Sequence, residues 1–235
     1  MQIQSADIDT IPLWLATWLA QREPLALHDL AAEPETVAIF SADMIVGFCN
    51  HGSLASERVG ALAAPVADLF QRAHDLGVRH FVLLQDTHDP GTPEFNAYPP
   101  HCVRGTGEAE TIAALQSLSF SDDYTVIEKN SLNPAIATGF DAWLDDHPAL
   151  NTAIVVGDCT DLCTHQLAMH LRMRANANNL TGYRVIVPAD CVDTYDLSPQ
   201  TATESGAMAH PADFFHPVFL YHLALNGIEV VTSLP

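Results

Sequence analysis

The sequence has few basic residues and almost no lysine. Nine Lys and Arg residues stand against 29 Asp and Glu in 235 residues, which gives a net charge of −20 at pH 7. Nucleic acids bind basic side chains that release counterions from their phosphates, and anionic membranes attract the same side chains, so we expect neither partner. Eight of the nine basic residues are Arg, which leaves Lys129 as the single lysine of the chain.

The sequence also lacks a long hydrophobic run and a regular cysteine pattern. Asp7 and Asp9 lie near the N-terminus, no basic region precedes the short apolar stretch 13–19, and we therefore predict neither a signal peptide nor a membrane-spanning helix. An odd number of irregularly spaced cysteines in a chain of this length favours free thiols in a reducing compartment, and hence a soluble cytoplasmic protein. The five cysteines are Cys49, Cys102, Cys159, Cys163 and Cys191.

What the chain does have is apolar residues in runs of strand length. Hydrophobic residues make up 48% of the chain and the mean hydropathy is +0.11, which predicts a packed core and excludes global disorder. The chain is of a size that α/β proteins commonly fold as one domain. The predicted strands are Val37–Met44, Arg79–Asp86, Tyr124–Lys129, Thr152–Asp158, Tyr183–Pro188 and Glu229–Ser233.

Stretches with apolar residues at every third or fourth position alternate with these strands and predict helices. They are Ser53–Leu76, with Ser53 as N-cap and Gly77 as its end, Glu108–Leu118, Ala137–Asp145, Asp161–Ala177 and Ala212–Leu225. This alternation predicts the α/β class: a doubly wound, mostly parallel sheet of about six strands with helices on both faces. We assign residues 36–235 to this domain, and residues 1–35, with a helix at Ile11–Arg22, to an N-terminal extension packed on it.

Several chemically active residue types fall where the predicted strands end, and ligands of open α/β sheets bind at that edge. Asp43 lies at the end of the first strand, Lys129 ends the third, and Cys163 lies in the first turn of the helix after the fourth. The N-terminus of a helix lowers a thiol pKa, which favours Cys163 as a nucleophile, although a free cysteine is also a common apolar filler. An ammonium at Lys129 can pair with Asp43 beside that thiol. Cys159 and Cys163 without a second Cys or His pair are a weak zinc pattern.

The longest irregular stretch, from about Thr87 to Gly107, has the length of a functional loop. Asp86 and His88 lie on one side of the strand end that precedes it, and Glu94 and His101 can return from the loop to complete a ligand set. Imidazole and carboxylate together suit zinc, iron or manganese rather than calcium or magnesium. The other interpretation is a polar loop shaped by Asp turns and prolines.

Two motifs carry a resemblance to a known family. The first is Gly-x-x-Thr-Asp-x-Cys, from Gly157 to Cys163, which follows an Asp at the first strand end and a Lys at the third. The second is Asp-x-His followed by Pro-Pro-His-Cys-Val-x-Gly-Thr, from Pro99 to Thr106. From about Val37 to Leu234 the chain thus resembles the isochorismatase-like cysteine hydrolases, and within them the nicotinamidases, whose loop binds a metal ion.

This resemblance implies the fold described above and a role for each matching residue. It implies hydrolysis of nicotinamide to nicotinate and ammonia through a cysteine thioester, as a step of NAD salvage, with one divalent metal ion per chain, zinc first. The implied catalytic triad is Asp43, Lys129 and Cys163. The resemblance also implies an oxyanion hole formed by the backbone N–H groups of Cys159 and Cys163, with a cis peptide between Asp158 and Cys159. It further implies that Phe48 and Tyr98 enclose the pyridine ring, and that the metal ligands are Asp86, His88, Glu94 and His101.

The chain departs from the family pattern at several positions. Glu94 stands where several relatives have His, Tyr98 where they often have Trp, and Cys159 where a small residue is usual; the segment 44–47 after Asp43 has lost its polar residues. These departures leave two alternatives open: an isochorismatase-like hydrolase of another small amide or carbamoyl compound, and a non-catalytic relative that binds a metal or ligand. A homo-oligomer is compatible with the sequence.

Overall fold

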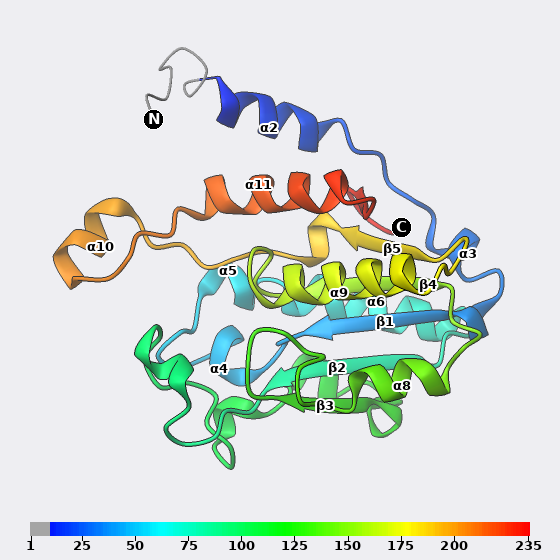
Figure 1. The fold of residues 1–235 in the computed structure, drawn as a ribbon, viewed down its shortest axis with the longest axis horizontal. Helices are drawn as coiled ribbons and strands as arrows, with labels where there is room; N and C mark the ends of the chain where they lie inside the picture. The colour runs from blue at the N-terminus through cyan, green and yellow to red at the C-terminus, as the bar shows by residue number, and fades with distance from the viewer. Residues whose placement is uncertain (1–9) are drawn as a thin grey trace.

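The computed structural model describes residues 10–235, in which six parallel strands form one sheet in the order β3-β2-β1-β4-β5-β6 (Figure 1). The strands are β1 (Val37–Ala42), β2 (His80–Asp86), β3 (Thr125–Lys129), β4 (Thr152–Gly157), β5 (Arg184–Pro188) and β6 (Glu229–Val231). Each of them lies within a predicted strand. The α/β class and the doubly wound parallel sheet are therefore confirmed.

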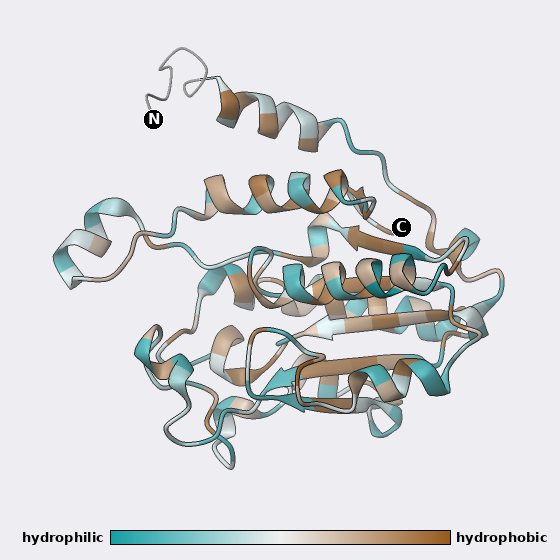
Figure 2. Ribbon diagram, viewed as in Figure 1, coloured by the Kyte–Doolittle hydropathy of each residue, from teal (hydrophilic) through white to brown (hydrophobic). Residues whose placement is uncertain are grey.

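Apolar residues on both faces explain why the strands form a covered parallel sheet. All six residues of β1 and of β4 are buried, and Figure 2 shows that the strands are strongly hydrophobic. The continuous apolar character is typical of strands that have helices on both sides. In chain order, β1, β2 and β3 extend the sheet toward one edge, and β4, β5 and β6 extend it toward the opposite edge. The strand order thus reverses between β1 and β4, where α/β sheets open a ligand crevice.

Two groups of helices cover the two faces. Val66, Leu69 and Phe70 of α6 pack with Leu115 of α7 in one core cluster, whereas Leu167 of α9 packs with residues of α8 and α11 in the other. The helices are α2 (Ile11–Ala20), α3 (Leu27–Leu30), α4 (Val46–Cys49), α5 (Glu57–Gly60), α6 (Ala63–Asp75), α7 (Ala113–Gln116), α8 (Phe140–Asp146), α9 (Cys163–Ala177), α10 (Pro199–Ser205) and α11 (Ala212–Leu225). Single 3-10 turns are η1 (Pro34–Thr36), η2 (Pro93–Asn96), η3 (Gly107–Ala109), η4 (Ser121–Asp123) and η5 (Ala189–Cys191).

The predicted helix from Ser53 to Leu76 is wrong in its first half. The structure has two helices there, α5 and α6, and Ser53 caps neither, because its hydroxyl donates instead to the Pro100 carbonyl at 2.7 Å. Pro65 lies in the first turn of α6. A proline fits there because no intrahelical partner is available to its nitrogen, but within a longer helix it would remove a hydrogen bond.

The predicted helix Glu108–Leu118 is also interrupted. Its central segment is extended and pairs with the chain that follows β1, since Val46 N–H donates to the Glu110 carbonyl at 2.9 Å and Ile112 N–H donates to the Met44 carbonyl at 3.1 Å. These bonds link segments far apart in the sequence, so helical periodicity did not reveal them. The short helices α3, α4 and α10 were not predicted, and α8 begins three residues later than Ala137, whose φ is +58°.

Helix α2 of the N-terminal segment lies beside α11 (Figure 1). The rings of Trp14 and Trp18 meet the Tyr221 ring edge-on, with centroids 4.8 and 5.1 Å away. Leu25 and Leu27 donate backbone hydrogen bonds to the C-terminal residues Ser233 and Pro235. None of the helices within residues 10–235 combines the length and the apolar character that a membrane span requires.

Candidate functional site

The structure brings Asp43, Lys129 and Cys163 together at the carboxyl edge of the sheet. Lys129 Nζ lies 2.8 Å from Asp43 Oδ2 and 3.4 Å from Cys163 Sγ. It also lies 2.5 Å from Asp86 Oδ1, a contact that the sequence did not predict. All four side chains are buried, with residue exposures between 1% and 5%. The single lysine is therefore enclosed by two carboxylates and a thiol.

Sheet register explains this convergence. Asp86 and Lys129 are paired across β2 and β3, while Asp43 follows the neighbouring strand β1 and Cys163 begins the helix after β4. Asp43 has a φ of +52°, in the left-handed region that few non-glycine residues adopt. The Asp86 backbone N–H donates to Asp43 Oδ1 at 2.7 Å and holds the carboxylate in this position.

The mutual charges of these groups set their protonation states. Burial, and then the neighbouring Asp86, raise the pKa of Asp43 to about 6 although Lys129 opposes them. Burial and the Asp43 charge raise the pKa of the Cys163 thiol well above its ordinary value. The sequence predicted a lowered thiol pKa at this helix N-terminus; burial and the adjacent carboxylate outweigh the helix dipole. At neutral pH the resting thiol is therefore protonated and needs a base.

Lys129 and Asp86 stay ionised because neighbouring groups of opposite charge outweigh the effect of burial on each pKa. Burial alone would lower the pKa of Lys129, but Asp43 and Asp86 outweigh burial and raise the pKa well above its ordinary value. Burial alone would raise the pKa of Asp86, but Lys129 and His88 outweigh burial and lower it. The ammonium and the Asp86 carboxylate thus stay ionised together.

The loop between β4 and α9 presents backbone N–H groups beside the thiol. The N–H groups of Leu162 and Thr164 donate to the Cys159 carbonyl at 3.0 and 3.2 Å. In the described part of the chain, neither Cys159 N–H nor Cys163 N–H has an acceptor. The peptide between Asp158 and Cys159 is cis, as the resemblance implied. The two N–H groups are therefore available to a negatively charged oxygen near the thiol.

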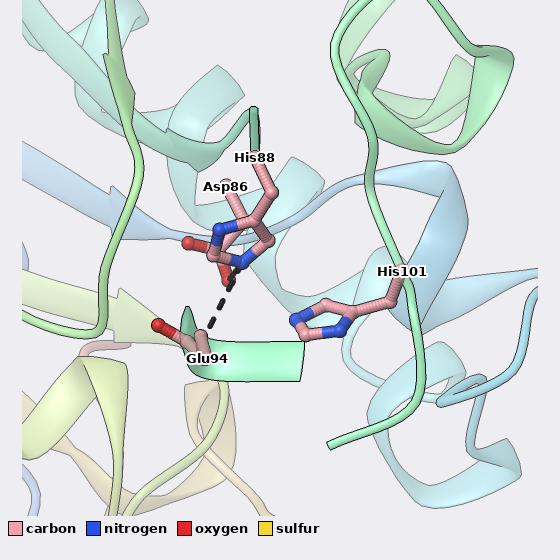
Figure 3. Close-up of side chains that lie close together, drawn as sticks. All are labelled: Asp86, His88, Glu94 and His101. Atoms are coloured by element: carbon pink, nitrogen blue, oxygen red, sulfur yellow. Dashed lines mark ion pairs between the residues drawn. The ribbon is translucent and has the colours of Figure 1, made fainter. Parts of the chain in front are cut away.

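Asp86, His88, Glu94 and His101 form a second cluster, shown in Figure 3. One ligand atom from each of them lies within 4.8 Å of all the others. His88 Nε2 is 3.5 Å from Asp86 Oδ2 and 3.7 Å from Glu94 Oε1. Asp86 ends β2, His88 follows it, Glu94 lies in η2, and His101 returns from the far end of the loop. Residues from four places in the chain converge as the sequence predicted.

The chemistry of this cluster fits a metal ion. His88 Nδ1 lies 3.2 Å from Asn130 Oδ1, and His101 Nδ1 lies 2.8 Å from the Pro99 carbonyl, so both rings are fixed from outside the cluster. Such outer contacts orient metal-binding imidazoles. His88 Nε2 and Glu94 Oε1 are buried and have no hydrogen-bond partner among the described residues. Buried polar atoms are rarely left unpaired, and a divalent cation bound by N and O ligands would satisfy both.

A cavity of about 590 Å³ opens above both clusters. Phe48 and Tyr98 form part of its wall, and the Phe48 ring lies 5.6 Å from the His101 ring. Lys129 and His88 are not among its lining residues. The predicted residues that do line it are Asp43, Phe48, Asp86, Glu94, Tyr98, His101, Cys159 and Cys163.

The sequence analysis missed other polar residues of this cavity. Asp158 lines it and is 1% exposed, and burial and the Asp43 charge raise its pKa well above its ordinary value. At the rim, Arg58 forms ion pairs with Asp193 at 3.0 Å and Asp213 at 2.9 Å. Asp158 is the last residue of the fourth predicted strand, so its position alone was a usable signal. The pairs of Arg58 join residues far apart in the sequence, and no local pattern indicates them.

The chain is similar in sequence to proteins of one known family. The sequence profile of the isochorismatase domain matches residues 37–213. The chain belongs to the isochorismatase family. Within this family it is 29% identical to Nicotinamidase 1 of Arabidopsis thaliana over 227 residues, covering 91% of both chains. It is 33% identical to the nicotinamidase/pyrazinamidase of Mycobacterium tuberculosis over 148 residues, covering 56% of this chain and 76% of that protein.

Solved structures share the isochorismatase-like fold. The pyrazinamidase of Pyrococcus horikoshii in complex with zinc superposes with a TM-score of 0.63 and 18% sequence identity, covering 83% of this chain and 98% of that one. At this identity the likeness establishes the fold alone. The chain is thus an isochorismatase-family hydrolase whose relatives include nicotinamidases.

Proposed function

We propose that this chain hydrolyses nicotinamide to nicotinate and ammonia, with Cys163 as the nucleophile. The observation that carries the proposal is the buried contact of Lys129 with Asp43 and Cys163, two residues that line a cavity together with three members of the four-residue cluster. A thiol, a base and two free N–H groups in one place are the parts that acyl transfer requires. The nicotinamidase relatives favour a pyridine carboxamide as the substrate.

Asp43 is the general base of the proposed reaction. With a pKa of about 6 it is mostly ionised at pH 7, and it accepts the Cys163 proton as the sulfur attacks the carboxamide carbon. The backbone N–H groups of Cys159 and Cys163 hold the oxyanion. The proton on Asp43 then passes to the departing ammonia, which leaves a thioester on Cys163. Water opens the thioester to nicotinate and restores the thiol.

Lys129 supports this reaction without exchanging a proton. Its pKa is raised well above the ordinary value, so the ammonium stays charged throughout. From 3.4 Å it stabilises negative charge as it develops on Cys163 Sγ, and at 2.8 Å from Asp43 it fixes the base. The same charge moderates the rise in the Asp43 pKa, which keeps Asp43 ionised near neutral pH.

Asp86, His88, Glu94 and His101 would hold one divalent metal ion, zinc first, with iron and manganese as alternatives. When bound, the ion would supply a Lewis acid near the ring end of the substrate. Phe48 and Tyr98 provide aromatic surfaces on which the ring packs. The proposed activity places the enzyme in NAD salvage in the cytoplasm.

A second candidate is a hydrolase of another small amide or carbamoyl compound. The size of the cavity, about 590 Å³, favours it because this volume accommodates molecules larger than one pyridine ring. The altered segment after Asp43 does not favour it. Met44 and Ile45 are buried in the core and none of residues 44–47 lines the cavity, so this segment does not form part of the wall.

Ammonia release from nicotinamide tests the proposal. Purified protein is assayed with added zinc, iron or manganese, beside Cys163→Ala and the control Cys191→Ala, which removes a buried thiol outside the cavity. We expect metal-dependent release by the wild type and the control, and none by Cys163→Ala.

Three outcomes would contradict parts of the proposal. Normal turnover by Cys163→Ala refutes the thioester. Folded wild-type protein that releases no ammonia from nicotinamide, but releases it from another amide in a panel, selects the second candidate. Failure with every amide, together with no selective labelling of Cys163 by a thiol reagent, points to the non-catalytic relative.

A further inference from the structure

Asp158 is a buried acid of the cavity that the proposed reaction does not use. It follows β4 directly, is 1% exposed and lines the cavity together with Cys159 and Cys163. Its Oδ1 is buried and has no hydrogen-bond partner among residues 10–235, while its Oδ2 is 3.7 Å from the Cys159 sulfur. A buried polar oxygen left without a partner costs stability, so its presence calls for a ligand.

Strand order places Asp158 on the other side of Asp43 from the four-residue cluster. β4 neighbours β1 on the side away from β2, and the Asp158 backbone N–H donates to the Ala42 carbonyl at 3.0 Å. The strand ends therefore run in the order Lys129, Asp86, Asp43, Asp158. The four-residue cluster includes Asp86, so a substrate whose ring points to that cluster has its carboxamide toward Asp43 and Asp158.

We infer that Asp158 is a substrate-binding residue that accepts a hydrogen bond from the N–H₂ group of the amide and selects amides over esters. This inference rests on the proposed function. In the proposed reaction the backbone N–H groups of Cys159 and Cys163 take the amide oxygen, so the two N–H donors of the amide nitrogen need a separate acceptor. Ionised Asp43 is engaged by Lys129 and by the Asp86 N–H, whereas Asp158 Oδ1 is free.

The electrostatics of the cavity are compatible with this role. Burial and the Asp43 charge raise the pKa of Asp158 well above its ordinary value, which favours the neutral form of the carboxyl group. A neutral carboxyl group has a carbonyl oxygen that accepts an N–H without placing a second negative charge beside the attacking sulfur. It does not compete with Asp43 for the thiol proton, because a neutral acid is not a base.

The test compares nicotinamide with its methyl ester, methyl nicotinate, which has the same ring and carbonyl but no N–H. Steady-state kcat/KM is measured for both compounds with the zinc-loaded wild type, Asp158→Ala and Asp158→Asn. The matched control is Asp190→Ala, which removes the acid that follows β5 and does not line the cavity. Thermal unfolding of each variant shows that it is folded.

We expect Asp158→Ala to lower kcat/KM for nicotinamide about 10-fold or more and to change the value for methyl nicotinate by less than about 2-fold. Asp158→Asn keeps a carbonyl oxygen and should retain most of the amide activity. Because Asp158 Oδ1 is unpaired, neither variant should unfold at a lower temperature than the wild type. A structural role would lower the unfolding temperature and both activities.

Equal losses on the amide and the ester, or no loss on either, overturn the inference while leaving the proposed function intact. A wild-type protein that releases no ammonia from nicotinamide overturns the proposed function, and the inference falls with it. The two failures are therefore distinguished by the wild-type measurement alone.

Discussion

Replacing Lys129 by Met should lower the free energy of unfolding at pH 7 by about 3–5 kcal/mol, the usual cost of removing one partner from a buried ion pair. Lys129 is 2% exposed, and its ammonium lies 2.8 Å from Asp43 and 2.5 Å from Asp86. Met has a similar volume, so the core stays filled. The loss arises because two buried carboxylates remain without a compensating charge.

The same substitution should make stability depend on pH in a defined direction. Without Lys129 the folded-state pKa of Asp43, already raised to about 6, rises further, and the pKa of Asp86, which Lys129 helps to hold below its ordinary value, rises as well. An acid with a raised folded pKa loses stability as the pH increases from its unfolded pKa through its folded pKa. The deficit of the variant should therefore be small near pH 4 and grow toward pH 7.

Urea unfolding at pH 5 and pH 7 measures both effects through the midpoint and slope of the transition. The control is Arg104→Met, because Arg104 pairs with Asp89 and Glu128 at the exposed edge of the same region. Solvent screens that network, so the control should change stability little. If Lys129→Met lost no more stability than Arg104→Met at pH 7, the buried charge balance described above would be wrong.

Three further predictions concern other parts of the molecule. His101→Ala should lower the zinc content, measured by elemental analysis, well below one ion per chain. The control His80→Ala, at the opposite end of β2, should keep its zinc. Equal zinc contents in the two variants would refute the four-residue metal site. Gly157→Ala should lower the free energy of unfolding by about 2 kcal/mol or more, because φ is +105° and a Cβ would lie 2.0 Å from the Ala42 carbonyl oxygen. Gly182 has a φ of +80° but open space around it, so in urea unfolding Gly182→Ala should lower the free energy of unfolding by less. His210→Gln should lower the unfolding temperature more at pH 5 than at pH 9. His210 Nε2 is 2.7 Å from Asp161 Oδ2, and despite burial this pair raises the pKa of His210 and lowers that of Asp161. Its stabilisation is complete between about pH 3.8 and 6.5, and is lost as the pH rises through the His210 pKa or falls through the Asp161 pKa; a loss independent of pH would exclude the ion pair.

Much of the fold was predictable because its signals are local. The central strands β1 and β4 are apolar runs between polar residues, and because both of their faces are buried nothing interrupts those runs. The prediction failed where distant segments compete with local preference. The segment around Thr111 pairs with the chain after β1, and Ser53 contacts the loop at Pro100 rather than capping a helix.

The candidate site was predictable to the extent that strand ends converge. Asp43 and Lys129 lie at the ends of predicted strands and Cys163 lies in the first turn of a predicted helix, and parallel strands bring such positions to one edge. Asp86 was predicted as a metal ligand, but its contact with Lys129 depends on the register of β2 and β3. This shared carboxylate joins the two clusters into one electrostatic unit.

The sequence by itself determined which residue types stand at the strand ends, since composition, periodicity and motif spacing are properties of the chain. It also determined that the single lysine ends the third strand. Only the tertiary structure decided how these groups titrate. Burial and proximity, which no local pattern encodes, keep the Cys163 thiol protonated, bring the pKa of Asp43 to about 6 and leave Asp158 Oδ1 without a partner in the cavity that Cys163 also lines. A pKa depends on every charge and solvent boundary within several ångströms, and those are fixed when the chain folds.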